Sequence, residues 1–257
     1  MADPSKPNSD SGSPQNFAKS FAEEISAADA NALPNFLDDS RLDDEHLCVL
    51  LARKDLPGTF LDELTRRREL LHSYSVIRAL SFHPSVPRKV ALRLLRELHL
   101  MDLMKLSQAA TAAPDLQRSA EEHLIARLPH VTLGQKIALA RQASARILAA
   151  LIVEGNAQVV EPAVENPRLT EAQVLKLLAR DKLPLAVVPA FCRSRRWTSV
   201  PNVALALLRY PHTPPEAAVK ILPHIASADL RALAQTKTIS QTMRRHMQRE
   251  LAHRSSL

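Results

Sequence analysis

The chain repeats itself at long range, and this repeat restricts its fold more than any other feature of the sequence. When the sequence is shifted by 127 residues, residues 50–124 align with residues 177–251 without a gap, and about 22 of the 75 positions are identical. Leu50-Leu-Ala-Arg53, for example, aligns with Leu177-Leu-Ala-Arg180. Self-similarity at a fixed period is the sequence signature of repeat architectures. We therefore predict that the two halves arose by internal duplication and share one fold.

Each half also contains a shorter motif with the features of a helix start. A turn at Asn166-Pro167 precedes Thr170, which has the character of an N-cap. Gln173 follows three residues later as the partner in a capping box, and apolar residues at helical spacing come next. Motifs that recur every 30–50 residues or so, each burying one helical stripe, are typical of an α-solenoid. Related motifs begin at Ser40, Pro84, Pro114, Pro167, Pro211 and Gln241.

The composition indicates a protein made of many short helices. Leu and Ala dominate, whereas only four residues are glycine and 4% are aromatic. Ala and Leu are strong helix formers, and few residues here favour strands. Eighteen prolines require many helix boundaries, because proline is tolerated in the first turn of a helix and disrupts its interior. We predict an all-α fold, a right-handed α-solenoid with two homologous halves.

We predict one continuous array with five parts. Residues 1–16 are polar and have almost nothing to bury, which is typical of a disordered tail. Residues 17–34 are predicted to form an N-terminal capping helix that covers the open end of the array. The first repeat set occupies residues 35–124 and the second occupies residues 157–254. Residues 125–156 are too apolar for a flexible linker, so we expect buried connecting helices there.

The motif Asn166-Pro-Arg-Leu-Thr170, followed by Ala- and Leu-rich helices, resembles the repeats of bacterial HEAT-like proteins and of the leucine-rich repeat variant. The resemblance covers roughly residues 35–252 and implies an α-solenoid. HEAT-like families mostly bind proteins; a minority bind nucleic acid, and one bacterial branch comprises DNA glycosylases that excise alkylated bases. Leucine-rich repeat variant proteins can carry a cysteine cluster for an iron–sulfur centre. Nothing in this chain matches that cluster, so the resemblance implies no cofactor.

The formal net charge of +7 is distributed unevenly along the chain. Residues 1–49 contain three basic residues against ten acidic ones, whereas the remaining residues contain 31 basic against 17 acidic. A basic body with an acidic leader can attract polyanions, or the leader can lie against the body. The simplest interpretation is an ordinary solvated surface, and the charge alone does not separate these three.

Arginine clusters at equivalent places in the two halves are the strongest candidate site. Guanidinium groups bind phosphate or carboxylate through paired hydrogen bonds, and equivalent positions in a solenoid tend to line one ridge. The alternative is that these arginines end helices and pack their stems over neighbouring residues. The predicted ridge for an anionic partner consists of Arg66, Arg67, Arg68, Arg193, Arg195 and Arg196.

The C-terminal run from Met243 to Arg254 is predicted to form a basic amphipathic helix. Its arginines can contact phosphates or a membrane surface. A helix of this kind also serves as the end cap of a solenoid, with its polar face in water. The arginines of this secondary basic surface are Arg244, Arg245 and Arg249.

The sequence favours binding over catalysis. The chain contains no HExxH pair, no glycine-rich phosphate loop and no nucleophile elbow, and Cys48 and Cys192 lack metal-ligand spacing. We expect a non-enzymatic scaffold protein, without metal or cofactor, that offers a rigid helical-repeat surface to a protein partner with an acidic segment.

The alternative function is binding of a nucleic-acid backbone, with glycosylase-like chemistry as its furthest extension. Trp197 is the only tryptophan, and the chain has no match to the set of aromatic residues of the glycosylase branch. The acid nearest to Trp197 in the sequence, Asp181, lies at a predicted turn. The N-terminus lacks the layout of a signal peptide, and no apolar run has the length of a membrane span. We therefore expect a cytoplasmic, bacterial-type protein; the sequence does not indicate an oligomeric state.

Overall fold

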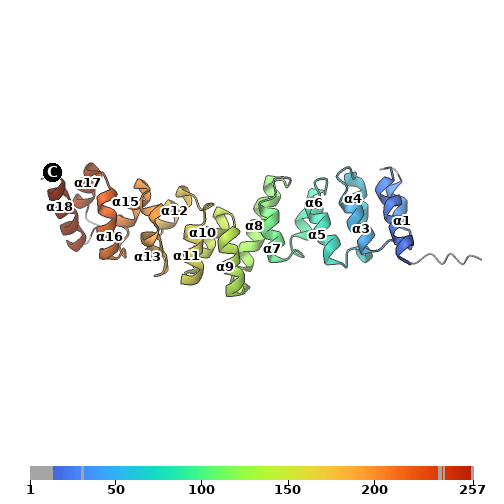
Figure 1. Cartoon of the computed structure of the whole chain (residues 1–257), viewed down its shortest axis with the longest axis horizontal. Coiled ribbons are helices and arrows are strands. Elements are labelled where there is room, and N and C mark those ends of the chain that lie inside the picture. The colour runs from blue at the N-terminus through green and yellow to red at the C-terminus, as the bar shows by residue number, and fades with distance from the viewer. Residues whose placement is uncertain (1–13, 30–31, 237–238, 240, 256–257) are drawn as a thin grey trace, which may run out of the picture. The chain divides into compact units, whose positions relative to one another are not determined.

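The computed structural model describes residues 14–29, 32–236, 239 and 241–255 (Figure 1). Within these ranges the chain consists of helices joined by turns, and no strand is present. This confirms the predicted all-α class. None of the helices in these ranges has the length and apolar character that a crossing of a bilayer demands. Residues 1–13, most of the predicted tail, lie outside the described residues.

The chain divides into two compact units, Met1–Ala120 (unit 1) and Glu121–Leu257 (unit 2), and the division falls within helix α8 (Pro114–Arg127). In unit 1, α1 packs on α3 and α3 packs on α5, while α2 packs on α4. The helices of unit 1 before α8 are α1 (Pro14–Ala27), α2 (Leu33–Phe36), α3 (Asp44–Leu51), α4 (Gly58–Arg66), η1 (Arg68–Leu70), α5 (Tyr74–Phe82), α6 (Arg88–Leu94) and α7 (Leu100–Ser107).

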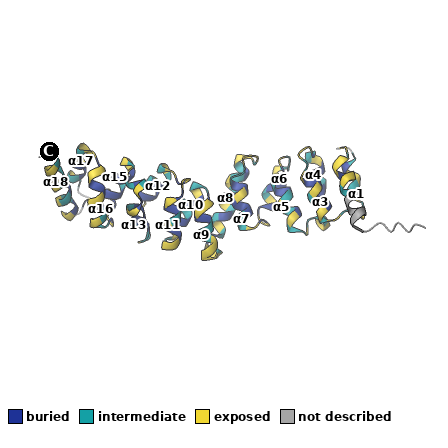
Figure 2. Ribbon diagram, viewed as in Figure 1, coloured by how far each residue is buried: buried dark blue, intermediate teal, exposed yellow. Residues whose placement is uncertain are grey.

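An apolar cluster holds the helices of unit 1 together. Phe21 and Ile25 of α1 meet Leu47 and Leu50 of α3, and all four side chains are buried. Their spacing of three or four residues puts each pair on one face of its helix. In Figure 2, buried and exposed residues alternate along the helices, as expected where each helix buries one face.

Unit 2 contains two rows of packed helices. In the first row α10 packs on α12 and α12 on α15; in the second, α9 packs on α11, α11 on α13, α13 on α16 and α16 on α18. The helices of unit 2 after α8 are η2 (Leu128–His130), α9 (Leu133–Gln142), α10 (Ala145–Glu154), α11 (Ala157–Glu165), α12 (Glu171–Leu178), α13 (Val187–Arg193), α14 (Arg195–Thr198), α15 (Pro201–Arg209), α16 (Pro215–Ile221), η3 (Leu222–His224), α17 (Ser227–Gln235) and α18 (Gln241–Ser255).

Local sequence signals set where two of these helices begin and end. Thr170 is the N-cap of α12, and its hydroxyl oxygen accepts a hydrogen bond from the backbone N–H of Gln173, as predicted. Helix α10 ends at Gly155, whose φ of 78° lies in the left-handed region. Glycine is the residue that adopts this conformation without steric cost. A Cβ atom at this position would lie 2.2 Å from Cβ of Pro184, so the close approach of that proline requires glycine as well.

The helices of the two units correspond at the 127-residue shift found in the sequence. Helices α3, α5 and α6 of unit 1 begin and end 127 residues before α12, α15 and α16 of unit 2. Helices α1 and α10 end at equivalent positions, Ala27 and Glu154. The row α1–α3–α5 therefore has its counterpart in the row α10–α12–α15. Equivalent residues of the two units can be compared position by position.

The element bounds refine two of the predicted segments. The predicted capping helix, residues 17–34, consists of two helices: α1, which begins at Pro14 within the predicted tail, and α2, which ends at Phe36. The predicted connecting segment, residues 125–156, contains η2, α9 and α10. Helix α10 buries Ile147, Leu148, Leu151 and Ile152.

Candidate partner-binding face

Two arginines of the predicted ridge point into the protein. The first is Arg67, whose Nη1 donates a hydrogen bond of 2.9 Å to the backbone oxygen of Leu37 and also pairs with Asp38. The hydrogen bonds from Arg67 hold the pKa of the Asp38 carboxyl below its ordinary value. Leu37 is the C-cap of α2, so Arg67 stabilises the end of a neighbouring helix.

The second is Arg196, which makes the equivalent kind of bond in unit 2. Its Nη1 donates 2.6 Å to the backbone oxygen of Asn166, the C-cap of α11, and its Nη2 donates 2.8 Å to that of Leu169. The guanidinium carbon lies 4.3 Å from the ring centroid of Trp197. Trp197 is only 2% exposed, and its Nε1 donates to the backbone oxygen of Val164. Arg196 and Trp197 therefore join helices within unit 2.

The other four arginines of the ridge are exposed. Nη1 of Arg66 lies 3.7 Å from Oε2 of Glu63, and Nη2 of Arg193 lies 2.8 Å from Oε1 of Glu161. Exposed ion pairs of this kind contribute little to stability and leave both charges accessible to a partner. The remaining two, Arg68 and Arg195, lie in η1 and α14.

The predicted basic helix at the C-terminus is α18. This helix packs on α16 and α17, and its Met243 and Met247 are buried. Nη2 of Arg244 donates a 3.0 Å hydrogen bond to the backbone oxygen of Thr236. Arg245 and Arg249 are exposed. The apolar side of α18 thus covers the end of the unit, and two of the three arginines of the secondary surface face solvent.

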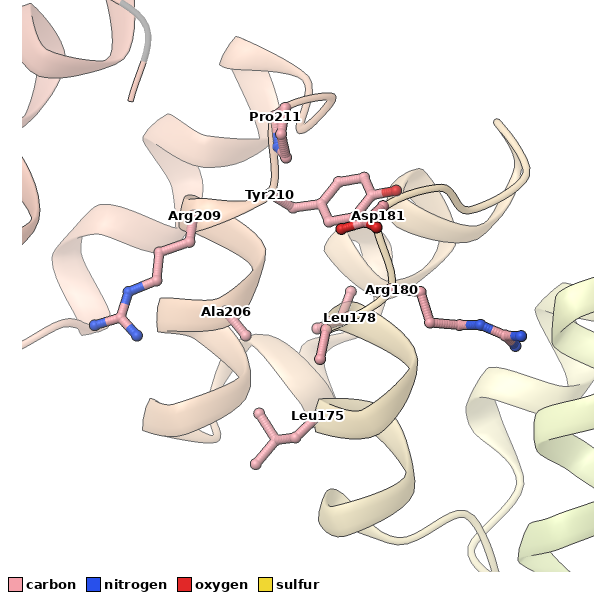
Figure 3. Close-up of a pocket in the computed structure, with 9 residues that line it drawn as sticks. Leu175, Leu178, Arg180, Asp181, Ala206, Arg209, Tyr210 and Pro211 are labelled. Carbon is pink, nitrogen blue, oxygen red and sulfur yellow. The ribbon is translucent and has the colours of Figure 1, made fainter. Parts of the chain in front are cut away.

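A second cationic surface, which the sequence did not single out, lies on the row α10–α12–α15 of unit 2. Two adjoining grooves run along this row. The first, between α10 and α12, has a volume of about 560 Å³ and is lined by Arg146, Ala149, Ala150, Val153, Gln173, Lys176, Leu177 and Arg180. The second, between α12 and α15, has a volume of about 410 Å³ and is lined by Leu175, Leu178, Ala179, Arg180, Asp181, Ala206, Arg209, Tyr210 and Pro211 (Figure 3).

Four cations line the two grooves. Lys176 and Arg209 lie in the last turns of α12 and α15, and Arg180 follows α12 directly. The C-terminal end of a helix carries a partial negative charge, which makes this a favourable place for cations. Figure 3 shows Arg180 and Arg209 extending in opposite directions from the second groove. The fourth cation, Arg146, pairs with Glu122 at 3.1 Å.

Lys176, Arg180 and Arg209 have no acidic partner within 4 Å among the residues that the structure describes. All three side chains are exposed. An accessible cation without an internal partner can form an ion pair with a ligand without first breaking an internal one. We call these three residues the cationic triad.

Arg180 is exposed, unlike its counterpart in unit 1. In unit 1 the equivalent residue, Arg53, is held: its Nη1 donates to the backbone oxygens of Ile25 at 2.9 Å and Ala28 at 2.7 Å, at the end of α1. Its Nη2 donates to Asp55 at 2.7 Å. In unit 2 the left-handed Gly155 ends α10 by a backbone turn, and Lys182 stands at the position of Asp55.

The floor of both grooves is apolar. Ala149, Ala150 and Val153 contribute to the first groove, and Leu175 and Ala206 to the second. The one aromatic residue of the lining is Tyr210, which is buried, and its hydroxyl oxygen accepts a hydrogen bond of 2.8 Å from the backbone N–H of Leu183. The face therefore combines cations at its rim with aliphatic surface between them.

The same positions of unit 1 do not form a cationic surface. Val49 occupies the place of Lys176, and Phe82 occupies that of Arg209. Lys176 and Arg209 were missed because the sequence comparison drew attention to arginines that the two halves share, and positions at which the halves differ in charge were the signal that would have found them. Arg180 aligns with Arg53, and only the different contacts of these two arginines distinguish them.

Two side chains, Cys192 and Asp102, carry groups that serve as a nucleophile or as a general acid or base in enzymes. Burial raises the pKa of the Cys192 thiol to about 11, and a thiol that remains protonated at neutral pH is a poor nucleophile. Asp102 accepts a hydrogen bond of 2.5 Å from the Tyr74 hydroxyl and one of 3.2 Å from Nε of Arg78. Burial raises the pKa of the Asp102 carboxyl, but these hydrogen bonds and the positive charges of Arg78 and Lys105 outweigh burial, and the pKa lies below its ordinary value.

Asp102 therefore links α7 to α5 as a carboxylate. The Tyr74 oxygen in turn accepts a hydrogen bond of 3.0 Å from the backbone N–H of His99, and the Tyr74 and His99 rings are stacked 3.7 Å apart. Within the described ranges, His, Cys, Asp and Glu side chains do not gather in groups of three or more that could hold a metal ion.

The chain matches no known protein family, no curated protein and no solved structure with which it was compared.

Proposed function

We propose that this protein is a non-enzymatic helical-repeat protein, and that each unit is a segment of an α-solenoid of HEAT-like repeats derived from a common ancestor by duplication. Two observations support this. Helix bounds in units 1 and 2 coincide at the 127-residue shift, and within each unit a helix packs on the next but one along the chain, as α1, α3 and α5 do. Stacking of this kind is the basis of repeat proteins.

The proposed activity is binding of a protein partner that carries an acidic segment, through the α10–α12–α15 face of unit 2. The observation on which this depends is the cationic triad, Lys176, Arg180 and Arg209, placed around grooves with an aliphatic floor. A carboxylate of the partner pairs with the cations, and apolar side chains of the partner cover the floor.

Binding of a nucleic-acid backbone is the competing function. The cations would suit phosphates, and unit 2 has the net charge for it, with 19 Lys and Arg against 10 Asp and Glu. Binding of single strands, however, depends on aromatic side chains on which bases stack. The only aromatic residue in the grooves, Tyr210, is buried. The aliphatic floor favours a protein.

The test compares partners recovered by the full chain from native lysate, with and without nuclease. We expect a set of proteins that resists nuclease treatment and that is lost when Lys176 and Arg209 are both changed to Glu. Arg231→Glu is the matched control, because Arg231 is an exposed arginine of α17, outside the two grooves. If only nucleic acid is recovered, or if nuclease removes every protein that depends on the triad, the nucleic-acid function is correct instead.

A further inference from the structure

We infer that the partner segment crosses α12 in an extended conformation at Arg180, with an acidic residue paired to Arg180 and an apolar residue in the groove on each side. This inference rests on the proposed function and specifies the ligand of the same face. Arg180 is then the residue that determines specificity.

The position of Arg180 is the first argument. It is the single residue that lines both grooves, because it follows the last turn of α12, the helix that separates them. A segment that occupies both grooves must therefore pass this guanidinium group. Arg180 is exposed, whereas its counterpart Arg53 is bound to backbone oxygens and to Asp55.

The spacing of the grooves is the second argument. Packed helices lie about 8–10 Å apart, so the centres of the grooves on the two sides of α12 are separated by about the same distance. A segment in the extended polyproline II conformation advances about 3.1 Å per residue and completes one turn every three residues, so side chains three positions apart lie on the same side. Two apolar residues three positions apart therefore reach the two grooves, and the residues between them lie next to Arg180.

The chemistry of the lining is the third argument. Ala149, Ala150 and Val153 on one side and Leu175 and Ala206 on the other offer aliphatic surface to apolar side chains. Asp181 lies at the rim of the second groove (Figure 3). Its negative charge disfavours a ligand that is anionic along its whole length, because some of the ligand's charges would face a like charge. A segment with acids at a defined position avoids this repulsion.

The partner motif that follows is apolar–acidic–acidic–apolar. The probe is a fluorescein-labelled peptide of twelve residues in which Leu-Asp-Asp-Leu is embedded in Gly and Ser. The control peptide has the same composition, with its two leucines adjacent and its two aspartates adjacent at the other end. A fluorescein-labelled DNA oligonucleotide of twelve nucleotides is the third ligand. Binding to the full chain is followed by fluorescence polarisation at low and moderate salt.

We expect the motif peptide to bind at least about fivefold more tightly than the rearranged peptide, and Arg180→Gln to weaken its binding about tenfold, as loss of a charge-assisted hydrogen bond predicts. Arg231→Gln should leave binding unchanged. Unchanged Trp197 fluorescence and thermal denaturation would show that each variant is folded. Equal affinity for the two peptides, no measurable binding of either, or an unaltered affinity in Arg180→Gln would overturn the inference.

Failure of this inference is distinguishable from failure of the proposed function. If the motif peptide fails while Lys176 and Arg209 are still needed for nuclease-resistant recovery of proteins, the motif is wrong and the protein-binding function stands. If the oligonucleotide binds, displaces the motif peptide and loses affinity steeply with salt, both are wrong and the face binds nucleic acid.

Discussion

The two units use the same arginine in opposite ways. Arg53 of unit 1 and Arg180 of unit 2 occupy equivalent positions after equivalent helices, α3 and α12. Arg53 holds the end of α1 through the backbone oxygens of Ile25 and Ala28. Arg180 is exposed, and the neighbouring helix α10 ends at the left-handed Gly155. Equivalent arginines of the two units thus differ in role: one joins two helices and the other is accessible to solvent.

The net charges of the two units differ as well, and unit 2 is the more basic one. Unit 1 has 15 Lys and Arg against 17 Asp and Glu, a formal net charge of −2, whereas unit 2 has 19 against 10, a net charge of +9. Arg53 is followed by Asp55, which accepts its hydrogen bond; at the equivalent position unit 2 has Lys182. Two units whose helices correspond can thus present different surfaces, and this difference supports the proposal that unit 2 is the one that binds an anionic partner.

The substitution with the largest expected effect on this comparison is Gly155→Ala. A left-handed alanine costs about 1–2 kcal/mol, and forcing its Cβ against Pro184 costs about 1–3 kcal/mol more, so we expect unit 2 to lose about 3 kcal/mol of unfolding free energy. This loss of unfolding free energy is measured by urea denaturation, with the fluorescence of Trp197, the only tryptophan, as the signal. Ala28→Gly at the equivalent position of unit 1 should leave this transition unchanged. A loss below about 1 kcal/mol would show that α10 does not need the glycine turn.

Arg53→Leu should have the next largest effect. It removes the hydrogen bonds to the end of α1 and to Asp55, and we expect a loss of about 2 kcal/mol in the local stability of α1. Amide hydrogen exchange, read by mass spectrometry on peptides from α1 and α3, reports this loss. Arg180→Leu is the matched variant and should change the exchange of α10 by less than about 0.5 kcal/mol. Equal effects of the two substitutions would remove the distinction between the two arginines.

Asp102→Asn should have the smallest effect of the three, about 1 kcal/mol, in unit 1. The pKa of the Asp102 carboxyl is lowered by folding, so its contribution is present above the unfolded value of about 3.9 and is lost as the pH falls through the lower folded value. Amide exchange of α5 and α7 should therefore differ between Asp102→Asn and the parent chain at pH 6 or so and converge in acid. Asp229→Asn is the control, because Asp229 is exposed and its unit lacks the tyrosine, with Pro201 in place of Tyr74. A difference that persists at low pH would contradict the assigned role.

Local signals in the sequence predicted much of the fold and little of the candidate site. Proline, Thr170 and Gly155 mark helix ends through their own backbone preferences and hydrogen bonds, which do not depend on distant residues. The predicted ridge was chosen by residue type and by equivalent place in the two halves. Arg66 and Arg193 remain exposed, but Arg67 and Arg196 donate to the backbone oxygens of Leu37 and Asn166, about 30 residues earlier in the chain. No short stretch of sequence shows such a partner.

By itself, the sequence determined that this protein is helical and that its halves correspond at a shift of 127 residues, because helix formation and capping depend on neighbours within a few positions. Only the tertiary structure decided which arginines are available. Whether a guanidinium group binds a backbone oxygen of its own chain or stays in solvent depends on where the preceding helix ends and on what lies across the groove. Arg53 and Arg180 follow equivalent helices, yet Arg53 donates to backbone oxygens at the end of the helix beside it and Arg180 stays in solvent.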